Sequence, residues 1–439
     1  MDGIGVAPRD PRAMIDQAPM SRFQWGIVAV MVGLNALDGF DVLSISFASP
    51  GIAADWGIDR AALGIVLSME LVGMALGSLV LGGIADRIGR RATILGCLCV
   101  MAAGMMGAAS AAGIASLCVW RVLTGLGIGG MLAATNAAVA EAANERQRSL
   151  CVVLMAGGYP VGSVVGGSIS AQLLTHYDWR AVFVFGALVT LAFIPLVLWR
   201  APESIAFLMH RRPAGALERV NAVLARMGHP TVAALPEPEP RRRQAPVVAL
   251  FSPDLRPLTI LLTLAYLAHI MTFYFILKWI PKIVVDMGFA PSAAAGVLVW
   301  ASVGGAAGSL LLGLLTARVR LLALTVGAML LSTLLVAWFG QKWTDLGTLS
   351  LVAGIAGFCT NAGVVGLYAL IARAFPTGVR ATATGFVIGV GRGGSAAAPA
   401  LAGALFAAGY ALPGVAATMA AGSLVAAIAL VALRKRIAA

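Results

Sequence analysis

The chain has 439 residues, of which 60% are hydrophobic and only 11% are charged. Soluble domains carry about 25% charged residues, so this composition excludes an ordinary soluble protein. The apolar surface is too abundant for one core and must face lipid. The net charge of +12 would suit a nucleic-acid-binding protein, but the placement of the basic residues explains it without nucleic acid.

Twelve apolar runs follow one another along the chain, each long enough to cross about 30 Å of hydrocarbon as a helix. They lie at 25–48, 61–84, 92–112, 114–140, 149–173, 180–200, 257–281, 292–316, 320–340, 346–372, 381–408 and 411–433. The predicted fold class is therefore all-α and integral to the membrane, with twelve transmembrane helices.

Polar segments divide these helices into two sets of six. We expect an N-terminal tail, a first bundle, a proline-rich linker, a second bundle and a C-terminal tail at 1–24, 25–200, 201–256, 257–433 and 434–439. A short amphipathic helix is expected near 214–228. The first 20 residues hold no apolar core, so we expect the first span to act as the insertion signal and no cleavable signal peptide.

The 31 basic residues indicate the orientation. Most fall on the tails, the linker and the loops of one face, including the runs at 241–243 and 434–436. Lysine and arginine accumulate on the cytoplasmic side of membrane proteins. We therefore expect a multi-pass protein of a bacterial inner membrane, with both termini and the linker in the cytoplasm.

The five cysteines lie in apolar helical stretches without metal-ligand spacing, and we interpret them as small packing residues. They are Cys97, Cys99, Cys118, Cys151 and Cys359. We expect no metal, no cofactor and no covalent chemistry, hence no enzyme.

A weak repeat relates the two halves. The tripeptide ending at Asn136 reads Ala-Thr-Asn, and the one ending at Asn361 reads Cys-Thr-Asn. Two related bundles around a site at the membrane midplane are a recurring transporter architecture. The two asparagines are polar groups in apolar helices, and we expect them to contact substrate or each other.

The loop after the second span reads Gly82-Gly-Ile-Ala-Asp86-Arg87-Ile-Gly89-Arg90-Arg91. It resembles the G-x-x-x-D-R-x-G-R-R loop of the major facilitator superfamily. One acid and three arginines can pair with charges and helix ends across the interface between the halves, and so hold one face closed as a gate. The alternative is simple anchoring by positive charge, which needs neither the acid nor the glycines.

The fourth span carries Arg121-x-x-x-Gly125-x-Gly127-x-Gly129-Gly130, which resembles a second signature of the superfamily. Arginine inside a membrane is costly, so Arg121 is a candidate substrate-binding residue. The glycines allow a neighbouring helix to approach closely. The alternative is an arginine that reaches the outer face of the membrane.

The first span carries Leu37-Asp38-Gly39-Phe40-Asp41. Asp38 and Asp41 are three residues apart and share one face of the helix, roughly 20–24 Å from its start. Desolvation and mutual repulsion favour their protonated forms, which suits a proton-coupled carrier. The alternative is that Asp41 only borders the outer surface.

This stretch looks like the corresponding one of the aromatic acid:proton symporters, the superfamily branch that imports benzoate-like acids. Other segments resemble the same branch, nearly from end to end. They are Asp178-Trp179-Arg180-x-x-Phe183, Pro202-Glu203-Ser204, Tyr274, Trp279-x-Pro281, Arg380-Ala-Thr-Ala-Thr-Gly385 and Gly389-x-Gly391-Arg392-Gly393-Gly394.

The chain departs from the family pattern at three places. The second-half gate loop, Ala317-Arg-Val-Arg320, has lost its acid, so that gate is expected to be weaker. Glu70 lies inside the second span, as a further proton carrier or as the partner of an arginine. His269 lies inside the seventh span, where we favour a hydrogen-bonded packing residue. Lys278 lies near the outer end of the same span and is expected to reach the membrane surface.

Arg392 lies roughly 16 Å into the eleventh span, between glycines that leave room for a ligand. A guanidinium in a cavity suits a carboxylate, and the alternative is an ion pair with Asp38 or Glu70. Aromatic residues that would surround a ring, or only pack, are Phe40, Tyr159, Phe273, Tyr274, Phe358 and Tyr368.

The resemblance implies proton-coupled import of a small aromatic carboxylate by alternating access. Protons would bind at Asp38, Asp41 and Glu70, and the substrate would contact Arg392, Arg121, Tyr274, Asn136, Asn361 and Tyr159. The expected partners are this substrate, protons and lipid, with the chain acting as a monomer. The alternatives are import of a non-aromatic acid such as muconate, proton:drug antiport, and a sensor that binds the acid without moving it.

Overall fold

The computed structural model describes residues 10–236 and 246–434, and this part of the chain is helical without strands. Twelve helices have at least 19 residues. They are α2 (Arg22–Trp56), α3 (Arg60–Ile88), α4 (Arg90–Ala109), α5 (Ile114–Ala142), α6 (Arg148–Leu173), α7 (Arg180–Arg200), α10 (Arg256–Asp286), α11 (Pro291–Leu315), α12 (Leu321–Phe339), α13 (Leu346–Ala374), α14 (Thr377–Ala407) and α15 (Leu412–Ala432). Of the basic runs noted in the sequence, the one at 241–243 and residues 435–436 of the one at 434–436 lie outside the described residues.

Eleven of these helices are long and apolar enough to cross a membrane. The twelfth long helix is α14, whose lower hydropathy follows from Arg380, Arg392 and many glycines. The observed helices confirm twelve membrane-spanning segments in two sets of six.

α2 is longer than its apolar run, because it continues through Pro50 to Trp56. Proline lacks the N–H that would bind the carbonyl of Ser46. The hydroxyl of Ser49 donates to that carbonyl at 2.8 Å instead. Gly57, with φ of +60°, then ends the helix.

Glycines hold the helices of each half close together. In the first half, a methyl group on Gly162 of α6 would overlap the carbonyl oxygen of Ala36 of α2. Gly125 and Gly129 of α5 bring α5 against the backbone of α3 in the same way. Such contacts drive association in lipid, where burial of apolar surface contributes little.

The second half repeats this arrangement, with α11 and α13 in place of α3 and α5. Gly308 of α11 lies against the carbonyl of Phe358, and Gly357 of α13 lies against that of Ala301. Each half is therefore a closely packed unit in which the backbones themselves are in contact.

The two halves meet along the pairs α2 with α10, α3 with α14, and α6 with α11. These contacts concentrate at one end. Arg60 pairs with Asp286 at 2.9 Å. A methyl group on Gly64 would stand 2.6 Å from the carbonyl oxygen of Pro399, and one on Gly167 would stand 2.8 Å from Val299.

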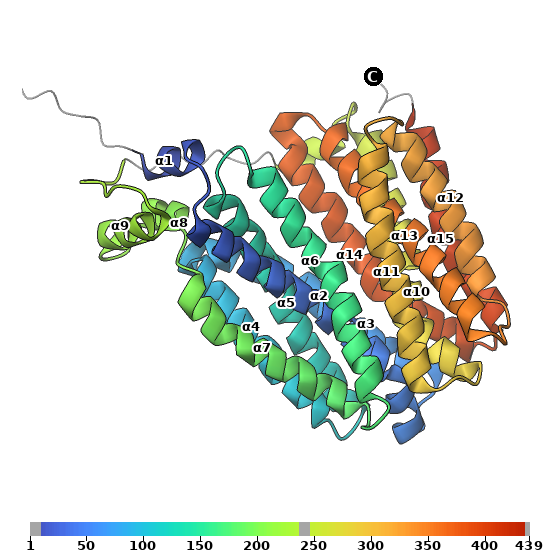
Figure 1. Ribbon diagram of the computed structural model, residues 1–439. Coiled ribbons are helices and arrows are strands. Elements are labelled where there is room, and N and C mark those ends of the chain that lie inside the picture. The colour runs from blue at the N-terminus through green and yellow to red at the C-terminus, as the bar shows by residue number, and fades with distance from the viewer. Residues whose placement is uncertain (1–9, 237–245, 435–439) are drawn as a thin grey trace, which may run out of the picture.

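At the other end of the same helices the halves are apart. We call this end the terminal face, because α1 (Pro11–Gln17) and the end of α15 both lie there (Figure 1). Four glycines near this end are exposed: Gly83, Gly157, Gly385 and Gly389. A methyl group added to any of them would touch no described atom of another helix. The structure is thus closed at the opposite face and open at the terminal face.

Three short helices cover the terminal face of the first half only. They are α1, α8 (Ile205–Arg211) and α9 (Ala216–Met227), and a 3₁₀ turn follows at Val247–Phe251. α1 is attached through the ion pair of Asp16 with Arg148. α9 is amphipathic, buries Val220 and Leu224, and places the guanidinium of Arg226 4.1 Å from the ring of Phe23.

Gly162→Ala should lower the stability of the protein, because the added methyl group overlaps the backbone of α2 and forces the helices apart. We expect a loss of about 1–3 kcal/mol, seen as a lower thermal unfolding temperature in detergent. Gly157→Ala is the matched control on the same helix, where the methyl group meets nothing. Equal unfolding temperatures for the two variants would contradict the close packing of α2 and α6.

Candidate substrate and proton site

A cluster of ionisable side chains is buried between the halves, near the closed end. Glu70 of α3 forms ion pairs with Arg121 of α5 and with Lys278 of α10, the latter at 3.2 Å. All three side chains are fully buried. Lys278 belongs to the second half, so one carboxylate joins both halves through a direct ion pair.

Each of the two cations also donates a hydrogen bond to a carbonyl group of α2. The guanidinium of Arg121 donates to the carbonyl of Asp41 at 3.2 Å. The ammonium of Lys278 donates to the carbonyl of Val42. The face of the Phe183 ring lies 5.3 Å from the Arg121 guanidinium carbon. These contacts offset much of the cost of burying the two cations, although the Nε–H of Arg121 has no hydrogen-bond partner among the described residues.

Asp38 and Asp41 lie beside this cluster, buried within α2. Both carboxylates interact electrostatically with Glu70. Among the described residues, neither carboxylate oxygen of Asp41 has a hydrogen-bond partner. A buried, unpaired carboxyl group is expected to hold a proton, because its charged form is strongly disfavoured there.

The structure shows where two basic residues lie whose position the sequence left open. Arg121 does not reach the outer face, because it is fully buried against Glu70. The prediction that Lys278 reaches the membrane surface is wrong. α10 continues through Pro281 to Asp286, so Lys278 lies deeper than the predicted end at 281 implied.

Arg392 lies apart from the cluster, on the side of the terminal face. It is half-buried, and its guanidinium donates to the carbonyl of Met74 at 3.2 Å, one turn beyond Glu70 on α3. Among the described residues it forms no ion pair with Asp38 or Glu70, so that alternative does not hold in this conformation. Its donor groups remain available to a ligand.

Tyrosines gather around Arg392. Tyr266 donates to or accepts from Tyr368 at 3.0 Å, and both Tyr266 and Tyr274 interact electrostatically with Arg392. Tyr159 of α6 lies opposite, within electrostatic range of Tyr274. Four of the six tyrosines in the chain thus lie on helices that border the interface between the halves, and two of them, Tyr266 and Tyr368, are in contact. Tyr266 was not among the sequence candidates, and no motif distinguishes it.

A cleft between α2, α6, α10, α11 and α13 lies next to these tyrosines. Its lining includes Tyr159, Phe273, Ser302 and Asn361. The amide of Asn361 donates to the carbonyl of Gly305 at 2.8 Å and to Ser309 at 2.7 Å, so it serves helix packing as well as lining the cleft.

Two further polar candidates, Asn136 and His269, form their hydrogen bonds within their own half of the chain. Asn136 donates to the carbonyl of Leu132 on its own helix and does not contact Asn361 among the described contacts. His269 is buried between Ser423 and the carbonyl of Thr360, each at 2.9 Å, which agrees with a packing role.

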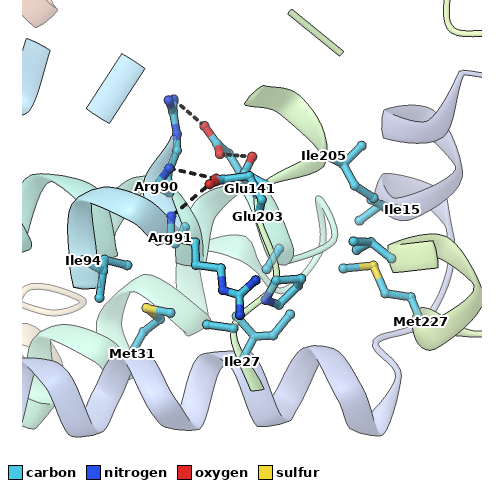
Figure 2. A pocket seen from close by; sticks show the side chains of 16 residues that line it. Ile15, Ile27, Met31, Arg90, Arg91, Ile94, Glu141, Glu203, Ile205 and Met227 are labelled. Carbon is cyan, nitrogen blue, oxygen red and sulfur yellow. Dashed lines mark hydrogen bonds and ion pairs between the residues drawn. The ribbon is translucent and has the colours of Figure 1, made fainter. Parts of the chain in front are cut away.

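The gate-loop residues form a network at the terminal face. Arg90 pairs with Asp86 at 3.0 Å and with Glu141 of α5 at 2.9 Å. Glu203 accepts the backbone N–H of Arg90 at 2.8 Å at the start of α4, where a negative charge is favourable. Figure 2 shows Arg90, Glu141 and Glu203 joined above apolar side chains of α2 and α4.

Glycine is required where the loop turns. Gly89 has a φ of +105°, and a side chain there would overlap the carboxylate of Glu203. Gly82 lies near the end of α3, and Arg87 is exposed. Arg91 donates to the carbonyl of Leu198 at 2.7 Å.

These partners differ from those expected, since we expected pairing across the interface between the halves. Every described partner of Asp86, Arg90 and Arg91 belongs to the first half or to the segment directly after it. The physical reason is the open terminal face, which places the second half out of reach. Among the described residues, no group of three His, Cys, Asp or Glu side chains could hold a metal ion.

Comparison with known proteins agrees with this architecture. Residues 31–348 match the family model of the Major Facilitator Superfamily. The chain is 32% identical over 411 residues to a gallate transporter of Pseudomonas putida, covering 93% of this chain and 91% of the relative. It is 31% identical over 392 residues to the 4-hydroxybenzoate transporter PcaK of Pseudomonas aeruginosa, covering 88% and 87%.

Among solved structures, a D-xylose-proton symporter superposes with a TM-score of 0.71 at 16% identity, covering 93% of this chain and 96% of that structure. The chain and this structure thus share one fold. The chain belongs to the major facilitator superfamily and is a multi-pass membrane protein that acts on a small molecule.

Glu203→Ala should weaken the terminal-face network, because the start of α4 loses both an acceptor and a negative charge. We expect a loss of about 1–2 kcal/mol, measured by thermal unfolding in detergent. Glu145→Ala in the loop between α5 and α6 is the control, since this exposed side chain forms no ion pair in the described structure and lies outside any helix. A shift no larger than that of the control would show that Glu203 does not stabilise the loop.

Proposed function

We propose that this protein is a proton-coupled importer of a small aromatic carboxylate. The observation that carries the proposal is the arrangement of Arg392 and four tyrosines between the halves, one helix turn from a buried group of carboxyl side chains. A guanidinium binds a carboxylate through two parallel hydrogen bonds. Tyrosines provide ring faces and hydroxyl groups for an aromatic ring and its substituents.

The relatives support this substrate class, since they are named for gallate and for 4-hydroxybenzoate, both of which are aromatic acids. Protons bind at Asp38, Asp41 and Glu70, and the halves rock about the site to expose it to each face in turn. The proton gradient drives the cycle, without a cofactor and without covalent chemistry. The protein acts as a monomer in the bacterial inner membrane, with the terminal face in the cytoplasm.

Asp38→Asn should abolish accumulation driven by a proton gradient, because an amide does not take up and release the proton. Uptake of radiolabelled 4-hydroxybenzoate into proteoliposomes, minus uptake into protein-free liposomes, measures this effect. Exchange of internal for external substrate needs no net proton movement and should persist. Asp55→Asn is the matched control, on the same helix but half-exposed and paired with Arg180.

A panel of gallate, benzoate, 4-hydroxybenzoate and muconate in the same assay identifies the substrate class. Accumulation of one aromatic acid supports the proposal. Binding without accumulation would indicate a sensor, and a response to muconate alone would indicate a non-aromatic substrate.

Arg392→Lys should raise the half-saturating substrate concentration in the exchange assay. An ammonium keeps the charge but not the paired hydrogen bonds, and losing about 1.4–2.8 kcal/mol corresponds to a rise of about 10–100-fold. Arg380→Lys, near the start of the same helix, is the control. An unchanged half-saturating concentration would remove Arg392 from the substrate site.

A further inference from the structure

One side of α7 faces lipid and ends at a tryptophan. Four large apolar side chains on this side are between 45% and 63% exposed: Leu188, Leu191, Leu198 and Trp199. α7 has 21 residues, so it is about 32 Å long, which matches about 30 Å of hydrocarbon. Trp199, next to its last residue, therefore lies at the level of the lipid headgroups on the terminal face, where tryptophan is enriched in membrane proteins.

Two arginines meet at this tryptophan. The guanidinium carbon of Arg200 lies 4.0 Å from the centre of the Trp199 ring, in a cation–π contact. Arg226 of α9, at the outer edge of the first half (Figure 1), donates to the backbone carbonyl of Trp199 at 3.1 Å. The same guanidinium lies 4.1 Å from the ring of Phe23 on α2. Side chains of α2, α7 and α9 thus gather two positive charges around one residue that faces lipid.

These charges have no acidic partner within the described structure. Over residues 10–236 and 246–434, no ion pair involves Arg200 or Arg226. Arg22, the first residue of α2, is exposed and adds a third arginine beside them that forms no ion pair in these ranges. Arg90 on the same face is, by contrast, paired with Asp86 and Glu141. The cluster therefore carries unbalanced positive charge where it borders the headgroup layer.

We propose that Arg200 and Arg226 bind the headgroup phosphate of an anionic phospholipid, whose acyl chains lie along the exposed side of α7. A guanidinium binds phosphate through two parallel hydrogen bonds. A zwitterionic phospholipid offers the same phosphate, but its ammonium group would meet the same cluster of arginines, so a headgroup with net negative charge is preferred.

The bound lipid would hold the linker helix α9 against the ends of α2 and α7. This role needs only the position of the cluster at the membrane boundary. It is independent of which solute the carrier moves and of the groups that bind it, since Arg200 and Arg226 lie outside the substrate and proton site.

The test uses purified full-length protein in detergent, with an equimolar mixture of phosphatidylglycerol and phosphatidylcholine that have the same acyl chains. Native mass spectrometry counts the lipids that each protein molecule retains, and titration gives the dissociation constants. We expect the wild type to retain phosphatidylglycerol in preference to phosphatidylcholine. Equal retention of the two lipids would overturn the proposal.

Arg200→Gln should raise the dissociation constant for phosphatidylglycerol about fivefold, since one arginine near the membrane surface is removed. Arg200 donates no hydrogen bond to a described atom, so this variant tests the site without loosening α9. Adding Arg226→Gln should raise the constant further, to about thirtyfold above the wild type.

Arg373→Gln is the matched control. It removes the same charge from an exposed arginine at the end of α13, on the terminal face of the second half. Its dissociation constant should equal that of the wild type. A constant unchanged in Arg200→Gln, or raised equally in Arg373→Gln, would show that the arginines around Trp199 are not the lipid site.

Glycerol 3-phosphate distinguishes a lipid from a soluble anion, because it carries the phosphate without acyl chains. Added in excess, it should leave phosphatidylglycerol bound, since the chains contribute their contact with α7. Displacement of the lipid by glycerol 3-phosphate would identify a site for soluble phosphates and overturn the assignment to a phospholipid.

Discussion

The structure depends on the binding of one carboxylate, Glu70, to two cations from different parts of the chain. Arg121 reaches it from within the first half and Lys278 from the second. Each ion alone would be very costly to bury, and an incomplete set of partners is costly as well. The closed end of the carrier is therefore stable only when α3, α5 and α10 meet with all three side chains in place.

Close packing at glycines transmits the constraint of this ion pair to the other helices of each half. Because backbones touch within each half, as at Gly162 and Gly308, the helices of a half cannot slide past one another without collisions. Movement is then concentrated at the helix pairs that join the halves, among them α2 with α10, α3 with α14 and α6 with α11. The ion pair joins α3 to α10 beside these contacts, where Lys278 also donates to the carbonyl of Val42 on α2, so it acts on two nearly rigid bodies.

Much of the fold could be predicted from the sequence, because lipid requires continuous apolar helices and the chain shows twelve of them. The ends of the helices were less predictable where a proline lies inside a helix. The run at 25–48 stops before Pro50 and the run at 257–281 stops at Pro281, yet both helices continue. Side chains and neighbouring helices satisfy the backbone groups that proline leaves without partners.

The residues of the site were predictable as candidates, because acids and bases inside apolar helices are rare and expensive. Their pairing was not, since it depends on how two separate halves meet. Lys278 was assigned to the surface because the predicted helix end lay too near. The sequence held one signal for this pairing: Glu70 and Lys278 are an acid and a base at similar depth in the membrane, and neither has an evident partner nearby in the sequence. The partners of the gate loop, Glu141 and Glu203, depend likewise on which face is open.

The placement of Lys278 late in the chain also affects biosynthesis. Asp38, Asp41, Glu70 and Arg121 enter the membrane with the first six helices, before α10 has been made. Within the first half, three acids face a single base, so these side chains alone leave two negative charges unbalanced when all are ionised. α10 later brings Lys278, the second cation that pairs with Glu70. The charge balance of the first half is thus completed only by a residue of the second half.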